Sequence, residues 1–248
     1  MKKIISVIMA LMIFGSVASA QTIGVLCYHG ISENPLKYDP YCISKTEFED
    51  DVSYFIQQGY NIIKPRNMWF AEGDKNIVLT ADDGYEELYY TMFPILKKYN
   101  VCAAIYIIGS RIDKTGYLKS WQIKEMHDSG LVEFGNHTYI MHRREQSVLK
   151  AYYSDDNMLK EAFWDIQKCS DALQKITGEK TQSIAFPYGE YSEKLYNTLL
   201  GEMGYTTTFS TESGILKDKS DFQKPIKRIY RNHGHIPQDM IDAINNYK

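Results

Sequence analysis

Two adjacent aspartates and two histidines further along the chain are the residues best suited to chemistry. Asp82 and Asp83 are neighbours, and two carboxylates this close repel each other unless a cation or a proton separates their roles. Two histidines and one carboxylate are a usual set of ligands for an open catalytic zinc site, and His137 and His142 offer such a pair. The second aspartate could then act as a general base on a water molecule at that site.

The spacing of the histidines restricts the backbone between them. Five positions correspond to a rotation of about 140° on a helix with 3.6 residues per turn. His137 and His142 therefore do not share a helical face. If both bind one cation, the segment between them must be a loop or an irregular turn.

Each polar cluster directly follows a short apolar run with the length of a buried strand. The two aspartates follow Ile77–Thr80, the first histidine follows Leu131–Phe134, and a Pro-Tyr-Gly turn follows Ser183–Phe186. Taken alone, each cluster is more often a turn or a helix cap. Because the carboxyl ends of parallel strands converge on the functional face of α/β folds, we expect the three clusters to meet.

Strand-like runs alternate with helical patterns along the chain, without a linker rich in Pro, Gly or Ser and without an internal repeat. The expected strands are Ile23–Tyr28, Ile77–Thr80, Val101–Ile108, Leu131–Phe134, Ser183–Phe186, Tyr205–Ser210 and Ile226–Tyr230. The expected helices are one that Ser44 caps and Gly59 ends, then Glu86–Tyr99 with a break at Pro94, Ser120–Ser129, Asp155–Ile176, Ser192–Met203 and Pro237–Asn246. This alternation predicts a single α/β domain, either a (β/α) barrel or an open parallel sheet.

The composition is that of a soluble globular chain. Of 248 residues, 44% are hydrophobic and 24% are charged, which excludes a disordered chain, a collagen-like repeat and a multi-span membrane protein. The formal net charge is −3, from 28 basic and 31 acidic side chains. A nucleic-acid-binding domain normally has a basic excess, so that partner is disfavoured.

The first twenty residues have the pattern of a secretory signal peptide. A basic start at Met1–Lys3, the apolar run Ile4–Phe14 and small residues up to Ala20 make up that pattern. The apolar run is shorter than the ~20 residues of a membrane-spanning helix. We expect cleavage after Ala20, which leaves one domain at 21–248, secreted or periplasmic and without a stable membrane anchor.

The four cysteines leave their pairing open. An even number in an oxidising compartment allows two disulfides in three possible combinations. Cys27 and Cys102 lie in strand-like runs, where a buried free thiol fits equally well, and Cys42 and Cys169 complete the set.

The motifs resemble those of polysaccharide deacetylases, the NodB-type fold of carbohydrate esterase family 4. Thr80–Gly84 resembles their Thr-Phe-Asp-Asp-Gly motif, and His137–His142 resembles the longer-spaced second motif of the poly-β-1,6-N-acetylglucosamine deacetylases. Phe186–Gly189 is similar to the third motif of that group, and Leu26–Ile31 to its first strand. The resemblance covers nearly the whole mature chain and implies an irregular (β/α) barrel.

Carried over residue by residue, the resemblance implies a catalytic centre. Asp82 is the general base, and Asp83, His137 and His142 bind one divalent metal ion, most often zinc. The metal polarises an acetamide carbonyl that water attacks, and a backbone N–H near Tyr188 helps to hold the oxyanion. The products are a free amine on the sugar and acetate.

The sequence departs from the family pattern at several positions. Ala81 replaces the usual Phe, and Ala185 stands where the third motif often begins with an Arg that orients the base. Our hypothesis is that Arg228, on a late strand, supplies this positive charge. The histidine that acts as general acid has no clean match, and His233 or His235 is the candidate.

Four residues are candidates for binding substrate. Tyr139, Pro187 and Tyr188 lie within or beside the second and third motifs. Tyrosine rings can stack on the apolar C–H faces of sugars, and 20 tyrosines are present. His29 follows the first strand, where it lines the site or only hydrogen-bonds a neighbouring loop.

The predicted function is metal-dependent removal of N-acetyl groups from an extracellular or cell-envelope N-acetylglucosamine polymer. Two alternatives stay open. An O-acetyl esterase on a xylan-type glycan would share the same metal site. A non-catalytic glycan-binding protein is suggested by Ala81 and Ala185, although the intact pairs of aspartates and histidines favour an enzyme. The expected partner is an acetylated polysaccharide, while the metal identity and the oligomeric state stay open.

Overall fold

The computed structural model describes residues 21–35, 39–143, 145, 149 and 153–247. Its strands are β1 Ile23–Tyr28, β2 Gly30–Ser32, β3 Cys42–Ser44, β4 Asn61–Ile62, β5 Asn76–Ala81, β6 Ala103–Ile107, β7 Val132–Asn136, β8 Ser183–Ala185, β9 Thr207–Phe209 and β10 Ile229–Tyr230. Its α-helices are α1 Lys45–Gln57, α2 Glu87–Tyr90, α3 Met92–Tyr99, α4 Ser120–Asp128, α6 Asp156–Thr177, α7 Glu193–Gly201 and α8 Pro237–Asn246. The proposed signal peptide, residues 1–20, lies outside the described residues. Within the described ranges, no helix combines the length and apolarity needed to cross a membrane.

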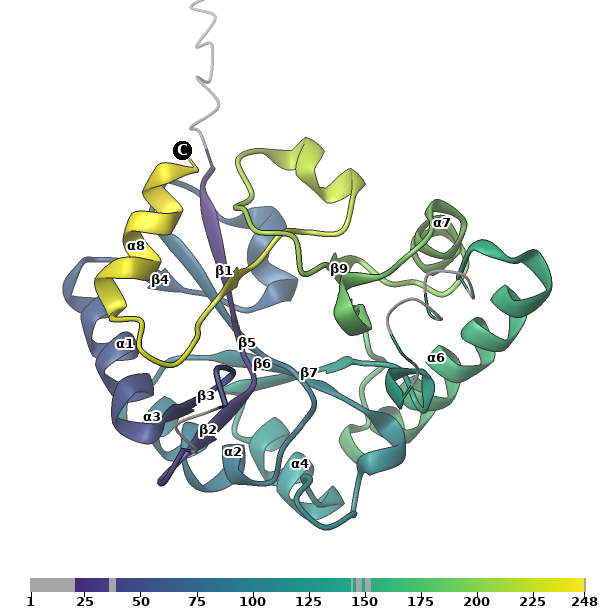
Figure 1. Cartoon of the computed structure of the whole chain (residues 1–248), viewed down its shortest axis with the longest axis horizontal. Helices are drawn as coiled ribbons and strands as arrows, with labels where there is room; N and C mark the ends of the chain where they lie inside the picture. The colour runs from purple at the N-terminus through teal and green to yellow at the C-terminus, as the bar shows by residue number, and fades with distance from the viewer. Residues whose placement is uncertain (1–20, 36–38, 144, 146–148, 150–152, 248) are drawn as a thin grey trace, which may run out of the picture.

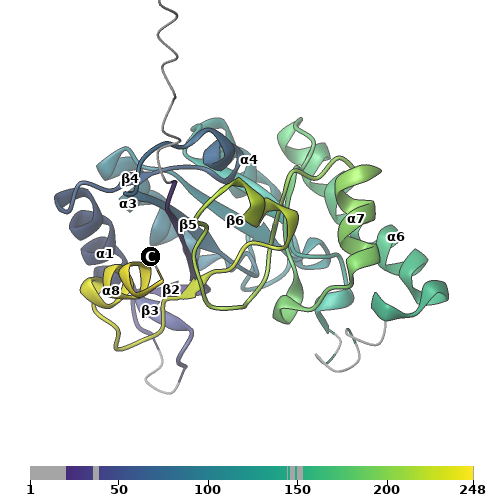
Figure 2. The same cartoon turned by 90° about the horizontal axis from the view of Figure 1, so that it is seen from above.

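A parallel sheet curves through the centre of the molecule. Its strand order is β10-β1-β5-β6-β7-β8-β9, with β4 paired to the first residues of β5. An isolated parallel bridge between Phe209 and Ile226 links the β9 edge to the segment that leads into β10. The α-helices lie around the outside of this sheet (Figure 1; Figure 2). The fold is therefore the irregular (β/α) barrel that the resemblance implied, in one domain.

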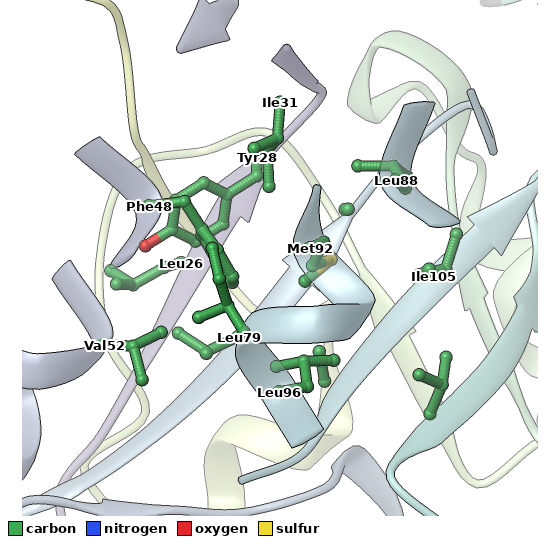
Figure 3. Packing of buried hydrophobic residues seen from close by; sticks show 14 of the residues in the cluster. Leu26, Tyr28, Ile31, Phe48, Val52, Leu79, Leu88, Met92, Leu96 and Ile105 are labelled. Atoms are coloured by element: carbon green, nitrogen blue, oxygen red, sulfur yellow. The ribbon is translucent and has the colours of Figure 1, made fainter. Parts of the chain in front are cut away.

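Strand β1 shows why the sheet is buried on both faces. Ile23 and Val25 belong to a core cluster on the inner side of the curve, together with residues of β5, β6 and β9. Leu26 and Tyr28 point the other way, into the cluster beneath the outer helices, where Phe48 of α1 packs against them (Figure 3). Apolar runs rather than strict alternation are expected for parallel strands covered on both sides.

Helix α1 begins where the sequence predicts. The Glu47 N–H donates to Ser44 Oγ at 3.1 Å, and the Ser44 N–H donates to the Glu47 carboxylate at 2.8 Å, which completes a capping box. Gly59 follows the helix with a φ of 76°, a conformation that glycine adopts without steric cost. The cap orients α1 so that its apolar face covers β1.

The helix expected over Glu86–Tyr99 is broken at a different residue. The structure ends α2 at Tyr90 and begins α3 at Met92, so Thr91 is the break rather than Pro94. Pro94 lies in the first turn of α3, where a missing N–H costs no helical hydrogen bond. The Thr91 hydroxyl donates to the carbonyl of Ile31 at 2.6 Å, which ties this break to β2.

The last strands are shorter than expected. The sequence predicts strands over Tyr205–Ser210 and Ile226–Tyr230, whereas β9 spans three residues and β10 two. The segments beside them pair through the Ile226 bridge, and the Arg228 N–H donates to the Glu212 carbonyl at 2.9 Å. A few backbone hydrogen bonds rather than a long ladder therefore join this part of the barrel.

All four cysteines are free thiols in the structure. Cys27 and Cys169 are buried on β1 and α6, and Cys42 and Cys102 are partly buried on β3 and before β6. Neither of the two possible disulfides is formed.

Candidate active site

The three polar clusters meet at the carboxyl ends of β5, β7 and β8, as expected. Asp83 follows β5, and its Oδ1 lies 3.6 Å from Nε2 of His137 and 3.2 Å from Nε2 of His142. The Tyr188 ring, after β8, stacks on the His142 imidazole with ring centroids 5.2 Å apart. Residues 105 positions apart in the chain, at 83 and 188, thus line one site.

The Asp83–His137–His142 group fits a divalent cation. One ligand atom from each residue lies within 4.8 Å of the other two. Asp83 Oδ1 is buried and accepts no hydrogen bond within the described part of the chain. A buried carboxylate oxygen without a donor is costly, and a cation between it and the two imidazoles would remove that cost.

The hydrogen bond on the far side of His137 sets its tautomer. His137 Nδ1 lies 2.7 Å from the carbonyl oxygen of Ala185, so this nitrogen donates and Nε2 keeps its lone pair. Burial lowers the pKa of His137 to about 4, so the ring is neutral near pH 7. The lone pair that faces Asp83 is therefore available to a metal.

The segment between the two histidines is an irregular turn, which confirms the prediction from their spacing. Thr138 has a φ of 64°, and its N–H donates to the Asn136 side chain at 2.7 Å. The Thr138 hydroxyl accepts the N–H of His142 at 3.1 Å. These contacts turn the chain back so that the second imidazole meets the first.

Asp165 of α6 holds the same turn from outside and was not anticipated from the sequence. Its carboxylate accepts the backbone N–H groups of Tyr139 at 2.6 Å and Ile140 at 2.9 Å. The Tyr139 ring packs against Gly109 and beneath Lys168 Nζ, which is 4.3 Å from the ring centroid. The described contacts of the Tyr139 ring, a candidate for binding substrate, are thus with Gly109 and α6 rather than with the Asp83 group.

Asp82 forms a fully buried ion pair with Arg228. The guanidinium donates two parallel hydrogen bonds to the two carboxylate oxygens, at 2.8 and 2.7 Å, and Arg228 Nε donates to the Ser210 carbonyl at 3.0 Å. Burial alone would raise the pKa of Asp82, but the charge and hydrogen bonds of Arg228 hold that pKa well below its usual range. Arg228 therefore lies where our hypothesis put the positive charge missing at Ala185.

Tyr85 is a site residue that the sequence reading missed. It follows the Asp-Asp-Gly turn directly, and its hydroxyl donates a hydrogen bond to Asp83. Burial and the nearby carboxylate raise the pKa of Tyr85 well above its ordinary value, so the phenol stays protonated. Its ring stacks on Tyr117 with centroids 5.4 Å apart, which forms a second aromatic wall beside the site.

Tyr188 and Pro187 form the wall after β8. Pro187 is buried and begins a short 3₁₀ turn, in which Tyr188 has a φ of 56°. The Tyr188 hydroxyl donates to the His142 carbonyl at 3.2 Å, while 41% of the residue remains exposed. An exposed ring next to a proposed metal ligand is available for contact with a sugar.

His29 lies on the opposite side, at the end of β1. Its ring stacks on Tyr230, 5.8 Å between centroids and nearly parallel, and contacts Tyr41. A nitrogen of His29, Cys27 Sγ and a carboxylate oxygen of Asp82 all lie within 4.8 Å of one another. His29 thus faces the Asp82 side of the site.

The described contacts of His233 are with the start of α1 and with the segment before β3. Its Nδ1 lies 3.6 Å from Glu47 at the start of α1, and its N–H donates to the Pro40 carbonyl at 2.9 Å. Arg231, held by Asp51, fixes the chain against α1 just before this histidine. The described contacts of His233 therefore do not support the expected role of general acid. His235 likewise contacts its own loop, through the N–H of Asn232.

Comparison with known proteins identifies the family. The polysaccharide deacetylase family model matches residues 71–208, more than half of the chain. The chain belongs to the polysaccharide deacetylase family. The matched range contains both aspartates, both histidines and the Pro-Tyr-Gly turn, whereas Arg228 lies beyond it.

Individual relatives agree with this assignment. YxkH of Bacillus subtilis (strain 168), whose name assigns it provisionally to the same family, is 28% identical over 197 residues, 77% of this chain and 64% of the relative. A poly-β-1,6-N-acetyl-D-glucosamine N-deacetylase of Staphylococcus aureus (strain MRSA252) is 25% identical over 200 residues, 75% of this chain and 67% of that protein. The chain thus matches about two thirds of the length of these relatives. The structure of IcaB from Ammonifex degensii has the same fold, with a TM-score of 0.79 and 24% identity over 91% of this chain and 98% of that one.

Proposed function

We propose that this protein is a metal-dependent polysaccharide deacetylase that hydrolyses N-acetyl groups of an N-acetylglucosamine polymer and releases acetate. The observation that carries the proposal is the buried Oδ1 of Asp83, which accepts no hydrogen bond from the described residues and faces two imidazole nitrogens, one position from a charged Asp82. The similarity to the Staphylococcus aureus deacetylase supports the substrate class.

The proposed metal ligands are Asp83, His137 and His142. Two histidines and one carboxylate suit zinc and leave coordination positions open for reactants. When bound, such a cation polarises the acetyl carbonyl and makes water more acidic. The chain itself orients the ligands, through Ala185 behind His137 and the irregular turn that carries His142.

Asp82 is the proposed general base. Arg228 keeps its carboxylate ionised, so it can accept a proton from the attacking water. The same two hydrogen bonds fix the plane of the carboxylate. Arg228 is therefore proposed as a positioning residue rather than as a group that touches substrate.

The amine that leaves the acetyl group requires a proton. Because the contacts of His233 are with Glu47 and Pro40, we propose His29 in place of His233 for this step. A nitrogen of His29 lies within 4.8 Å of the Asp82 carboxylate, so a proton taken up by the base is near the group that would return it.

The aromatic walls are proposed to hold the sugar ring. Tyr188 presents an exposed ring on one side, and Tyr85 and Tyr117 form a stacked pair on another. Flat rings with a phenolic hydroxyl can contact both the C–H face and the hydroxyl groups of a sugar. The backbone N–H near Tyr188 remains the proposed oxyanion donor.

Export is also a proposal. A signal peptide at 1–20, cleaved after Ala20, would deliver the domain at 21–248 to the periplasm or the medium, where an envelope or matrix polysaccharide is found.

Purified Gln21–Lys248 tests the proposal directly. Bound metal would be measured by elemental analysis, and acetate release would be followed on β-1,6- and β-1,4-linked N-acetylglucosamine oligomers and on acetylated xylan. We expect metal, and acetate from an N-acetylglucosamine oligomer. Acetate from xylan alone would favour the O-acetyl esterase, and neither metal nor acetate would favour a glycan-binding protein.

A matched variant shows whether the measured acetate release comes from this site or from a contaminating enzyme. The double substitution of His137 and His142 by alanine should remove both the metal and the activity. Activity that survives in this variant contradicts the assignment of the ligands.

A further inference from the structure

A second group of potential metal ligands lies beside the first and shares none of its residues. Cys27 is the second-to-last residue of β1, His29 follows that strand, and Asp82 follows β5. The pairing of β1 with β5 places Tyr28 beside Ala81, and the Asp82 N–H donates to the Tyr28 carbonyl at 3.0 Å. The three side chains are therefore held together by the sheet itself.

The spacing within this group matches a thiolate-containing metal site. The Cys27 thiol donates a hydrogen bond to Asp82 Oδ2, with Sγ 3.6 Å from that oxygen, and a cation would replace the thiol proton. In a tetrahedral zinc site with Zn–S near 2.3 Å and Zn–O near 2.1 Å, the distance between sulfur and oxygen is about 3.6 Å. A nitrogen of the partly buried His29 lies within 4.8 Å of Sγ and of a carboxylate oxygen of Asp82, so it is the third potential ligand.

The donor types select the kind of cation. Sulfur and imidazole nitrogen favour zinc, cadmium or copper over magnesium or calcium, which prefer oxygen. Cys27 is buried and its thiol must release a proton to solvent when the metal–sulfur bond forms. Each Asp82 oxygen has a second lone pair, so Oδ2 can bind a cation while it accepts a hydrogen bond from Arg228.

The positive charges nearby predict that this group binds a cation more weakly than the Asp83 group does. The guanidinium of Arg228 already neutralises Asp82, and it repels a cation at Oδ2. A cation held by the neighbouring Asp83 adds to that repulsion. Occupancy is therefore expected only when the cation exceeds one equivalent.

We propose that Cys27, His29 and Asp82 form a second, weaker site for a thiophilic divalent cation, and that its occupancy inhibits the enzyme. A cation bound there occupies a lone pair of Asp82 and a nitrogen of His29, so these atoms can no longer accept or donate a proton. The binding site is independent of the proposed function, whereas the inhibition rests on it.

The binding is tested with cadmium. Full-length mature protein, loaded with one equivalent of Zn²⁺, is titrated with Cd²⁺ while the ultraviolet charge-transfer absorption of the cadmium–thiolate bond is recorded. We expect one further equivalent to bind with this absorption in the wild type. Cys27→Ser and Cys27→Ala should both lose it, and Cys102→Ser, a matched control at a partly buried thiol, should keep it.

Two outcomes overturn the site. One is a wild type without the thiolate absorption, and the other is an absorption that persists in both Cys27 variants. Retention of the first zinc equivalent by Cys27→Ser and Cys27→Ala shows that they are folded.

The inhibition is tested with excess Zn²⁺ in the acetate-release assay. Activity of the wild type should fall by about 10²-fold, as expected for loss of a general base, while Cys27→Ser keeps its activity. Equal inhibition of both proteins overturns the inhibitory role. Absence of acetate from every form would instead overturn the proposed function and leave the cadmium result standing.

Discussion

Two buried arginine–aspartate pairs use arginines only three positions apart in the chain, yet the two pairs differ in their hydrogen bonds. Arg228 and Asp82 face the site, while Arg231 and Asp51 lie between α1 and the end of β1, and all four side chains are almost fully buried. Arg228 donates to both oxygens of its partner. Arg231 donates only through Nε, at 2.7 Å, and turns another N–H to the backbone of Asn232.

The difference in bonding decides the charge of each carboxylate. Asp82 has a pKa well below its usual range, since Arg228 outweighs the effect of burial. Burial raises the pKa of Asp51 to about 6, because Arg231 and the Tyr28 hydroxyl satisfy only one oxygen and Oδ1 accepts no hydrogen bond in the described part of the chain. The bidentate pairing with Arg228 therefore keeps Asp82 ionised at a lower pH than the single-oxygen contacts keep Asp51.

The largest expected effect is the difference in acetate release between variants of Asp82 and Asp51. Asp82→Asn should lower acetate release by about 10²- to 10⁴-fold, because the general base is lost while the metal ligands remain. Asp51→Asn, the matched control, should leave the activity of the folded protein near that of the wild type. Acetate release and bound metal would be measured on both. Full activity in Asp82→Asn would contradict the role of Asp82 as base.

Replacing either arginine should lower the free energy of unfolding, and the loss should differ between the two pairs. Arg228→Met leaves a buried, charged carboxylate without its ion-pair partner, and we expect a loss of about 3–5 kcal/mol in the free energy of unfolding. Arg231→Met should cost about 1–3 kcal/mol, since Asp51 becomes neutral more readily and keeps its hydrogen bond with Tyr28. Urea unfolding measures both.

A double-mutant cycle provides the control for the first pair. Asp82→Asn combined with Arg228→Met should recover part of the stability that Arg228→Met loses alone. Equal losses for the two arginine variants would show that the bonding pattern does not matter.

The pH dependence of stability tests the state of Asp51. The folded protein keeps the Asp51 proton up to about pH 6, whereas the unfolded chain loses it near the ordinary value of 3.8. Between these values the folded state binds more protons, so the free energy of unfolding falls as pH rises, by at most about 3 kcal/mol. Unfolding measured across this window should show a smaller fall for Asp51→Asn. Identical slopes for the two proteins would refute the raised pKa.

The smallest expected effect concerns another buried aspartate, Asp165, whose hydrogen-bond partners in the described ranges are backbone N–H groups. Asp165 is bonded by the N–H groups of Tyr139 and Ile140. Asp165→Asn should loosen the turn that carries His142 and weaken metal binding by about tenfold, as for other groups that orient metal ligands. Titration with a competing chelator measures this affinity. An unchanged affinity would show that Thr138 alone sets the turn.

Sequence patterns predicted the elements whose interacting residues lie close together in the chain. The capping box of α1, the apolar runs of β1, β5 and β7, and the irregular turn between the histidines follow from local spacing and propensity. The motifs also placed the candidate site at strand ends. Short elements were less predictable, because β9 and β10 depend on contacts with distant strands.

Residues that act through tertiary contacts were not predictable. Asp165 lies within a long amphipathic helix, and Tyr85 in a turn, where polar residues commonly face solvent. Asp165 meets Tyr139, 26 positions earlier, only in the folded chain. Tyr85 is close to Asp83 in sequence, but its contact with that carboxylate depends on the shape of the turn between them. Arg228 was anticipated only because Ala185 stands where the family motif often has an arginine, so that a positive charge was sought elsewhere in the chain.

The position of Arg228 has a consequence for how the protein acquires its site. Arg228 bonds to a residue 146 positions earlier, across the barrel seam that β10 closes against β1. Closing so long a loop costs chain entropy, so we expect this contact to form late in folding. We infer that Asp82, the proposed base, is oriented only after β10 has joined the sheet. A nascent or partly folded chain would then contain both aspartates but lack the ion pair that orients Asp82, and we expect it to be inactive.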